Sequence, residues 1–117
     1  MQGLSGPGFR EISFDVRPGE VLGFSGLIGS GRTSTAKAIV GAIRKSAGEI
    51  YINGRPVKIS SPNDAIAQRI GYLPEDRKTE GLILSKSVKE NITLPSVRSK
   101  FYKGFIIDSP KERGTAR

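Results

Sequence analysis

A glycine-rich stretch, residues 26–33 (GLIGSGRT), constrains the fold of this chain more than any other feature of its sequence. Two outer glycines, Gly26 and Gly31, are followed by the basic residue Arg32 and the hydroxyl residue Thr33, which is the spacing of a phosphate-binding loop. The apolar run before it, residues 21–25 (VLGFS), is typical of a strand covered on both faces. The sequence therefore predicts a strand, a phosphate loop and a helix in succession.

The predicted helix covers residues 33–41, and its apolar face consists of Ala36, Ile39, Val40 and Ile43. In this arrangement the backbone N–H groups of the loop and the positive end of the helix converge on a phosphate chain. The hydroxyl of Thr33 is suited to Mg²⁺. Arg32 keeps the positive charge of the usual lysine but presents a broad planar fork. The predicted nucleotide-binding residues are Gly26, Gly29, Ser30, Gly31, Arg32, Thr33 and Ser34; a glycine-rich turn without a ligand is the alternative.

Local signals elsewhere predict an α/β fold with a mixed sheet, flanking helices and a hairpin flap. Residues 9–16 and 49–53 alternate as strands do, and Asn53-Gly54 favours a hairpin into residues 56–59. Ser61-Pro62 opens a helix, residues 70–73 (IGYL) read as a core strand, and residues 87–90 form a capping box. We expect a nucleotide-binding core over residues 1–95 and a basic tail over residues 96–117, where no element is predicted.

Composition limits the chemistry that this chain can carry. It has no cysteine and no histidine, so disulfides, thiolate zinc sites and a histidine base are excluded. Nineteen basic against eleven acidic residues give a net charge of +8, which suits nucleic acid, acidic lipid or a phosphorylated small molecule. A basic nucleic-acid-binding domain is thus an alternative, although no known reader motif is present. A small phosphate-loop kinase is another, but it lacks a predicted metal-binding acid and a base.

Four segments taken together resemble a known family: GEVLGFSGLIGSGRTSTAKAIVG, SAGEIYINGRPVKISSPNDAI, IGYLPEDRKTEGLILSKSVKENITLP and FIIDSPKER. They are similar to the second ATPase half of bacterial sugar-import ABC ATPases of the ribose, galactose, xylose or arabinose type, and the likeness covers nearly the whole chain. The resemblance implies a P-loop NTPase core that binds Mg-ATP. It also implies an arginine in the phosphate loop, here Arg32, and a Pro-Glu-Asp-Arg-Lys segment, here residues 74–78.

Departures from the general ABC pattern bear on catalysis. Glu75 stands where a standard ABC domain carries a glutamine that helps position Mg²⁺ and water, so the resemblance implies Thr33 and Glu75 as metal residues. The chain contains no Leu-Ser-Gly-Gly segment, no full apolar run ending in Asp-Glu and no switch histidine. Asp108 only mimics the end of the metal-binding strand. We therefore expect a truncated chain that binds ATP without hydrolysing it alone, and whether it is itself an enzyme stays open.

The resemblance also implies partners and a location. These are ATP, the remainder of the ATPase chain, and permease subunits whose coupling helix is received at residues 74–90, on the cytoplasmic face of the plasma membrane. Met1 falls after the first strand of the family, so an unpaired sheet edge is expected to promote self-association. Phe9 is the nearest aromatic to an adenine site but is expected to pack in the core. The basic residues of the tail read as solvated surface: Lys100, Lys103, Lys111, Arg113 and Arg117.

Overall fold

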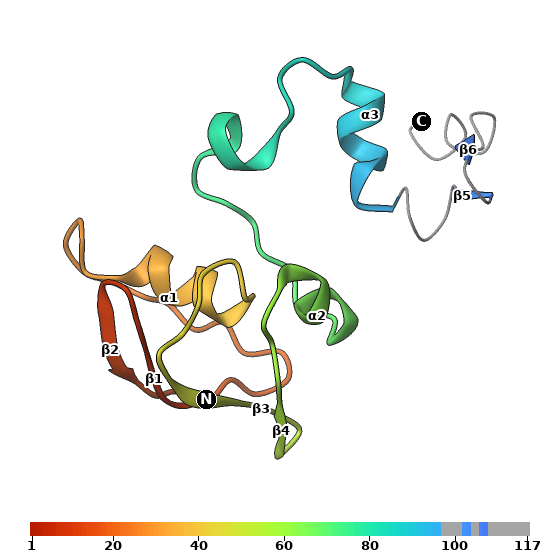
Figure 1. Ribbon diagram of the computed structural model, residues 1–117. Helices are drawn as coiled ribbons and strands as arrows, with labels where there is room; N and C mark the ends of the chain where they lie inside the picture. The colour runs from red at the N-terminus through yellow and green to blue at the C-terminus, as the bar shows by residue number, and fades with distance from the viewer. Residues whose placement is uncertain (97–101, 104–105, 108–117) are drawn as a thin grey trace. The chain divides into compact units, whose positions relative to one another are not determined.

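The chain divides into two units, Met1–Leu73 and Pro74–Arg117. The computed structural model describes residues 1–96, 102–103 and 106–107 (Figure 1). Asp108 and the basic tail residues lie outside the described residues, except Lys103, which is described only as part of a strand.

The first unit is built on a four-stranded antiparallel sheet in the order β2-β1-β3-β4 (Figure 1). Strands β1 (Gln2–Gly6) and β2 (Phe9–Ile12) form a hairpin closed by Pro7 and Gly8. Strands β3 (Ala47–Ile52) and β4 (Arg55–Val57) form a second hairpin. Its turn residues, Asn53 and Gly54, both have positive φ, 51° and 74°, as the tight turn favoured by Asn-Gly requires. The predicted hairpin flap is therefore confirmed.

Two short helices accompany this sheet. Helix α1 (Arg32–Ile39) has Val40 as its C-cap, and the φ of 71° at the following Gly41 allows Ala42 N–H to donate to Lys37 O at 2.8 Å. Helix α2 (Pro62–Ala67) begins at Ser61, whose hydroxyl accepts from Asp64 N–H at 3.3 Å. The glycine near the end of α1 and the Ser61-Pro62 start of α2 were predicted from the sequence and are confirmed, although α1 spans residues 32–39 and not the predicted 33–41.

The core of the first unit lies between the sheet and these helices. Its buried apolar residues are Leu4, Phe9, Ala38, Val40, Ile50, Ile59 and Ala65. From the predicted helix face, Val40 is buried, while Ile39 and Ile43 pack partly against the core. Phe9 is 9% exposed, so the prediction that it packs in the core is confirmed.

Two predicted core strands are absent from the structure. Residues 21–25 have no regular structure, and Val21 and Phe24 are 94% and 50% exposed. Residues 70–73 are also irregular, and Leu73 is 92% exposed. A buried strand is stable only when its N–H and C=O groups pair with neighbouring strands, and the described residues provide no strand beside either segment. Likewise residues 9–16 are a strand only as far as Ile12.

The α/β class is as predicted, but the expected mixed sheet is, within the described residues, entirely antiparallel. Each observed pair in the sheet joins segments that lie within the first unit. Of the chain that the structure describes, no helix is both long and apolar enough for a bilayer crossing.

The second unit contains short helices. A π-helical turn, η1 (Arg77–Gly81), follows Asp76, whose carboxylate accepts from Lys78 N–H at 2.8 Å. Helix α3 (Val88–Thr93) begins with the predicted capping box, in which Ser87 and Glu90 exchange hydrogen bonds, and this prediction is confirmed. The turn η2 (Leu94–Ser96) and the strand pair β5 (Tyr102–Lys103) and β6 (Ile106–Ile107) complete the described part.

Candidate functional site

The candidate site is the glycine-rich loop that precedes α1. Gly29 and Gly31 both have a φ of 85°, a left-handed conformation that side chains rarely adopt. The loop folds back on itself, because Ser30 N–H donates to Leu27 O at 3.1 Å. A β-carbon on Gly26 would lie 2.8 Å from the Ser30 hydroxyl oxygen, so a larger residue there would displace the Ser30 side chain. Backbone conformation therefore favours glycine at two points of the predicted phosphate loop, Gly29 and Gly31.

Gly31 is the residue at which the loop meets the β1–β2 hairpin. A β-carbon there would clash with the Gly8 carbonyl oxygen and lie 3.0 Å from the β-carbon of Phe9. Gly31 is also the N-cap of α1 and provides no side-chain cap, while its carbonyl accepts from Thr35 N–H at 2.8 Å. The helix therefore starts directly against the hairpin turn, with the N–H groups of its first turn facing out of its N-terminal end, as in any helix.

Seven residues line a hollow of about 240 Å³ at this helix end: Gly8, Gly29, Ser30, Gly31, Arg32, Thr33 and Ser34. All the predicted nucleotide-binding residues except Gly26 are among them; Gly26 lies at the base of the loop. Gly8 was not predicted, because its place beside the loop depends on packing between segments distant in the sequence. The Pro7-Gly8 pair signals a turn, but nothing in it indicates a neighbour.

The electrostatics of this hollow favour an anion. Arg32 is exposed at its edge, and the first turn of α1 contains no acidic residue. The helix dipole adds partial positive charge at the same end. Three residues that carry hydroxyl groups, Ser30, Thr33 and Ser34, are among those that line the hollow. Together these groups match the oxygen atoms of a phosphate chain.

The predicted metal residues belong to different units: Thr33 to the first and Glu75 to the second. Glu75 is exposed, and its neighbour Asp76 accepts hydrogen bonds from Thr79 and from Lys78 N–H, which lower the pKa of the Asp76 carboxyl. Among the described residues, no group of three or more His, Cys, Asp or Glu side chains is arranged to hold a metal. A metal at Thr33 would therefore need oxygen ligands from a bound phosphate chain and from water.

A second hollow, of about 400 Å³, lies in the second unit and was not predicted. Its lining is largely apolar: Leu82, Ile83, Leu84, Lys86, Val88, Asn91 and Ile92. Hydrogen bonds from the Asn91 side chain hold the segment that lines this hollow. The amide oxygen accepts from Ile83 N–H at 2.8 Å, and the amide nitrogen donates to the carbonyls of Ile83, Lys86 and Ser87 at 3.1–3.3 Å.

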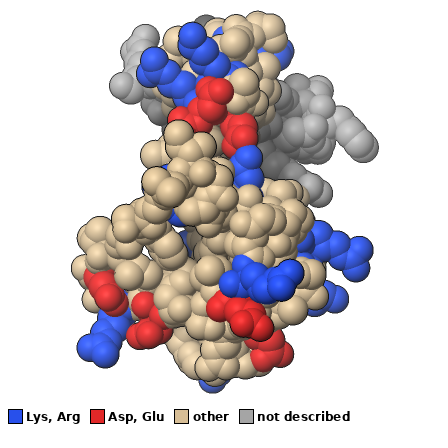
Figure 2. Space-filling model, turned by 90° about the vertical axis from the view of Figure 1, so that its left-hand side faces the viewer, with Lys and Arg blue, Asp and Glu red and all other residues tan. Residues whose placement is uncertain are grey.

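The charge of +8 does not form a single basic surface on the face that Figure 2 shows. Lys and Arg side chains there lie next to Asp and Glu side chains. This mixed face lacks the continuous basic stripe that nucleic-acid-binding domains present.

Comparison with known proteins gives a consistent result. A family model described as ABC transporter matches residues 9–115. The ribose import ATP-binding protein RbsA of Lactococcus lactis subsp. lactis is 50% identical over 105 residues, which are 90% of this chain and 21% of that protein. The protein of the same name from Geobacillus kaustophilus is 53% identical over 105 residues, with the same coverage.

A putative ribose/galactose/methyl galactoside import ATP-binding protein of Rhizobium meliloti is 47% identical over 107 residues, or 92% of this chain and 21% of that protein. The chain thus spans about a fifth of the length of the curated relatives that it matches. No solved structure matches it.

Proposed function

The chain belongs to the ABC transporter family, and we propose that it forms a nucleotide-binding part of an ATPase that drives sugar import. The observation that carries this proposal is the hollow formed by residues 29–34 at the N-terminus of α1. The names of the relatives, which describe ribose or galactoside import, support sugar as the cargo. Arg32 and residues 74–78 favour the second ATPase half of such a protein.

In the proposed complex, the phosphate chain of ATP occupies this hollow. The N–H groups of residues 29–34 and the helix dipole bind the phosphate oxygens, and the Arg32 guanidinium balances their charge. Gly29 and Gly31 allow the left-handed backbone, with a φ of 85°, that shapes this loop around the ligand. The chain thus binds the nucleotide chiefly through backbone groups.

Mg²⁺ fits the donors at this site, since hydroxyl oxygen is a hard ligand of the kind that Mg²⁺ prefers. Thr33, which lines the hollow, would hold it together with phosphate oxygens and water. When bound, the ion neutralises phosphate charge. Glu75, which belongs to the second unit, is proposed as a metal residue from the resemblance alone. The chain's own contribution is to fix the Thr33 hydroxyl at the first turn of α1.

We further propose that the chain alone does not hydrolyse ATP. Hydrolysis requires an oriented water and groups that stabilise charge around the terminal phosphate. The sequence has no histidine and no Leu-Ser-Gly-Gly segment, and Ser109 follows Asp108 where a catalytic glutamate is expected. These groups would have to come from the rest of the ATPase.

The second unit is proposed to face the permease at the cytoplasmic surface of the membrane. The apolar hollow between residues 82 and 92 supports this role, because it exposes Leu84, Val88 and Ile92 by 69%, 77% and 56%. Contiguous exposed apolar surface of this kind marks interaction sites. Reversing the charge of Arg77 and Lys78 in the full transporter should reduce co-purification with the permease, and unchanged co-purification would contradict this role.

Calorimetric titration of Mg-ATP into the chain tests the nucleotide site. We expect weak binding by the wild type, none by Gly31→Asp, and no steady phosphate release by either. Gly54→Asp is the matched control, because Gly54 also has positive φ but lies in the β3–β4 turn with open space around it. Absence of wild-type binding would contradict the site, and steady release abolished by Gly31→Asp would contradict the lack of turnover.

A further inference from the structure

Thr35 is a buried polar residue of α1 that the proposed function does not use. It is 5% exposed, and Thr35 and Ala38 are the buried residues of this helix. The Thr35 hydroxyl donates to the carbonyl oxygen of Gly31, the N-cap, at 2.8 Å. A valine would fill nearly the same space without a polar group that must be satisfied. Packing therefore explains the burial of this side chain but not its hydroxyl.

The Gly31 carbonyl accepts two hydrogen bonds from Thr35. Besides the hydroxyl, the Thr35 N–H donates to it at 2.8 Å. The N–H bond is the first bond of the helix ladder, which any residue but proline would make at position 35. The hydroxyl bond can be made only by serine or threonine at this position. One backbone donor and one side-chain donor thus hold the Gly31 carbonyl along the helix.

The same peptide group presents its other end to the phosphate hollow. A peptide group is planar and trans, so the Arg32 N–H points opposite to the Gly31 C=O. Because the C=O points along α1 towards Thr35, the N–H points out of the N-terminal end of the helix, where Gly31 and Arg32 line the hollow. Fixing the Gly31 carbonyl therefore fixes the direction of the donor on Arg32.

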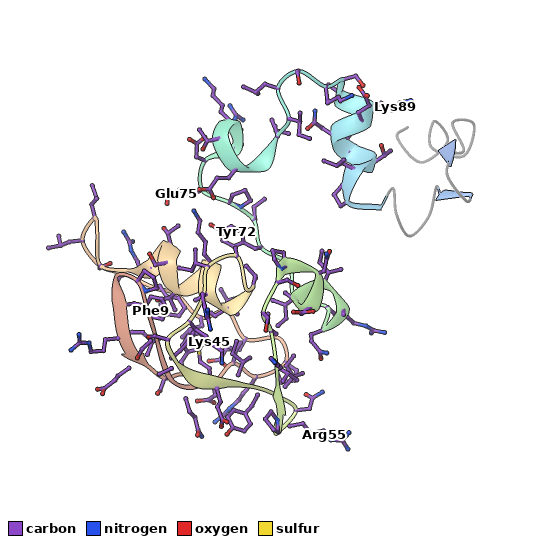
Figure 3. The ribbon with its side chains drawn as sticks, viewed as in Figure 1. Phe9, Lys45, Arg55, Tyr72, Glu75 and Lys89 are labelled. Atoms are coloured by element: carbon purple, nitrogen blue, oxygen red, sulfur yellow. The ribbon has the colours of Figure 1, made fainter. Side chains whose placement is uncertain are left out.

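The β1–β2 hairpin restrains Gly31 from another side. A β-carbon on Gly31 would overlap the Gly8 carbonyl oxygen and lie 3.0 Å from the β-carbon of Phe9. Phe9, which is labelled in Figure 3, starts β2 and belongs to the core cluster together with Ala38. This packing positions the α-carbon of Gly31, but glycine has wide backbone freedom, so it leaves the following peptide plane free to turn. The hydrogen bonds from Thr35 supply the restraint on that plane.

From these contacts, and resting on the proposed nucleotide site, we propose that Thr35 is a positioning residue for phosphate binding. Its hydroxyl orients the Gly31–Arg32 peptide so that the Arg32 N–H is already directed at a phosphate oxygen before the ligand arrives. Thr35 is not among the residues that line the hollow, so it acts through this peptide group. A preorganised donor binds more tightly because less free energy is spent on ordering it. The hydroxyl should raise the affinity about three- to tenfold, the range of one hydrogen bond.

Calorimetric titration of three variants with Mg-ATP tests this role. Thr35→Val removes the hydroxyl and should weaken binding about three- to tenfold, whereas Thr35→Ser keeps the hydroxyl and should bind within about twofold of the wild type. Thr93→Val is the matched control. Thr93 is 1% exposed and its hydroxyl donates to Lys89 O at 2.9 Å, but it lies in the second unit, so its loss should leave the affinity unchanged.

The outcomes separate this inference from the proposed function. Binding by Thr35→Val within about twofold of the wild type would overturn the inference and leave the nucleotide site intact. Binding by Thr35→Ser that is as weak as that of Thr35→Val would also overturn it, because the effect would then come from packing. Absence of binding by the wild type would overturn the proposed nucleotide site, and this inference with it.

A measurement on the wild type does not depend on any variant folding. A phosphate oxygen that accepts from the Arg32 N–H polarises the peptide group and thereby strengthens the hydrogen bonds to the Gly31 carbonyl. Titration with Mg-ATP should therefore move the amide proton resonances of both Arg32 and Thr35 downfield. If ATP binds and the Thr35 resonance does not move, the peptide does not link Thr35 to the ligand and the inference is overturned.

Discussion

A β-carbon added to Gly31 would overlap the carbonyl oxygen of Gly8, so the last glycine of the phosphate loop is in direct contact with the β1–β2 turn. This contact sets where α1 begins relative to the sheet. Because the obstacle is backbone rather than a flexible side chain, a larger residue at position 31 displaces the hairpin or the loop.

Gly31→Ala should therefore lower the free energy of unfolding by about 2–4 kcal/mol, combining left-handed strain with overpacking. Gly29→Ala is the matched control. Gly29 has the same φ of 85° but open space around it, so only the strain, about 1–2 kcal/mol, should apply. Urea denaturation of both variants measures the difference, and equal losses would contradict the importance of the Gly8 contact.

Arg69→Gly should stabilise the first unit. Arg69 follows α2 with a φ of 61°, and Ile70 N–H donates to Ala65 O at 2.9 Å, a helix ending that favours glycine. We expect a gain of about 0.5–1 kcal/mol from relief of the left-handed strain.

Gly41→Ala is the opposite case at the equivalent position after α1. Its added β-carbon would lie 2.6 Å from Ser61 N, so it should destabilise the unit. Thermal unfolding should show a higher melting temperature for Arg69→Gly and a lower one for Gly41→Ala than for the wild type. A lower melting temperature for Arg69→Gly would contradict the prediction.

Asn91→Asp should loosen the wall of the apolar hollow in the second unit. Aspartate keeps the acceptor for Ile83 N–H but replaces the amide donor to Ile83, Lys86 and Ser87 carbonyls with a charged oxygen. The expected cost is about 1–3 kcal/mol, since a donor is lost and the new charged oxygen repels these carbonyl oxygens, of which those of Ile83 and Ser87 still accept from backbone N–H groups. Hydrogen exchange over residues 82–87 should quicken in Asn91→Asp, and unchanged exchange would show that this side chain does not hold the wall.

Lowering the pH should destabilise the first turn of α3, because Glu90 becomes protonated. Hydrogen bonds from Ser87 N–H and from the Ser87 hydroxyl, with a smaller contribution from Lys86, lower the pKa of Glu90 from 4.5 to about 2. Because the folded pKa is the lower one, this stabilisation is complete above pH 4.5 and is lost as the pH falls towards 2. The Ser87 amide resonance should report a midpoint near 2. In Glu90→Gln the resonance should not titrate, and a wild-type midpoint near 4.5 would contradict the capping box.

Sequence reasoning succeeded where structure depends on neighbours along the chain. The Ser87 capping box, the Asn53-Gly54 turn and the Ser61 cap each form hydrogen bonds within a few residues, so their signals are complete in the sequence. The prediction of strands over residues 21–25 and 70–73 was wrong. An apolar run indicates that a segment is buried, but it does not indicate which strand would pair with it. Gly8 and Asn91 were missed for a related reason, since each acts through a contact that residue type alone does not reveal.

The pairing of β1 with β3 has a consequence for how the first unit folds. Each hairpin closes over a two-residue turn, whereas β1 and β3 pair Gln2 with Glu49 and thereby enclose the phosphate loop and α1. Closing a longer loop costs more chain entropy, so the hairpins should form early and the central pair late. Gly48, where a β-carbon would meet the Leu4 backbone at 2.5 Å, lies at this late contact. If the central pair forms last, Gly48→Ala should unfold faster than the wild type with little change in the folding rate.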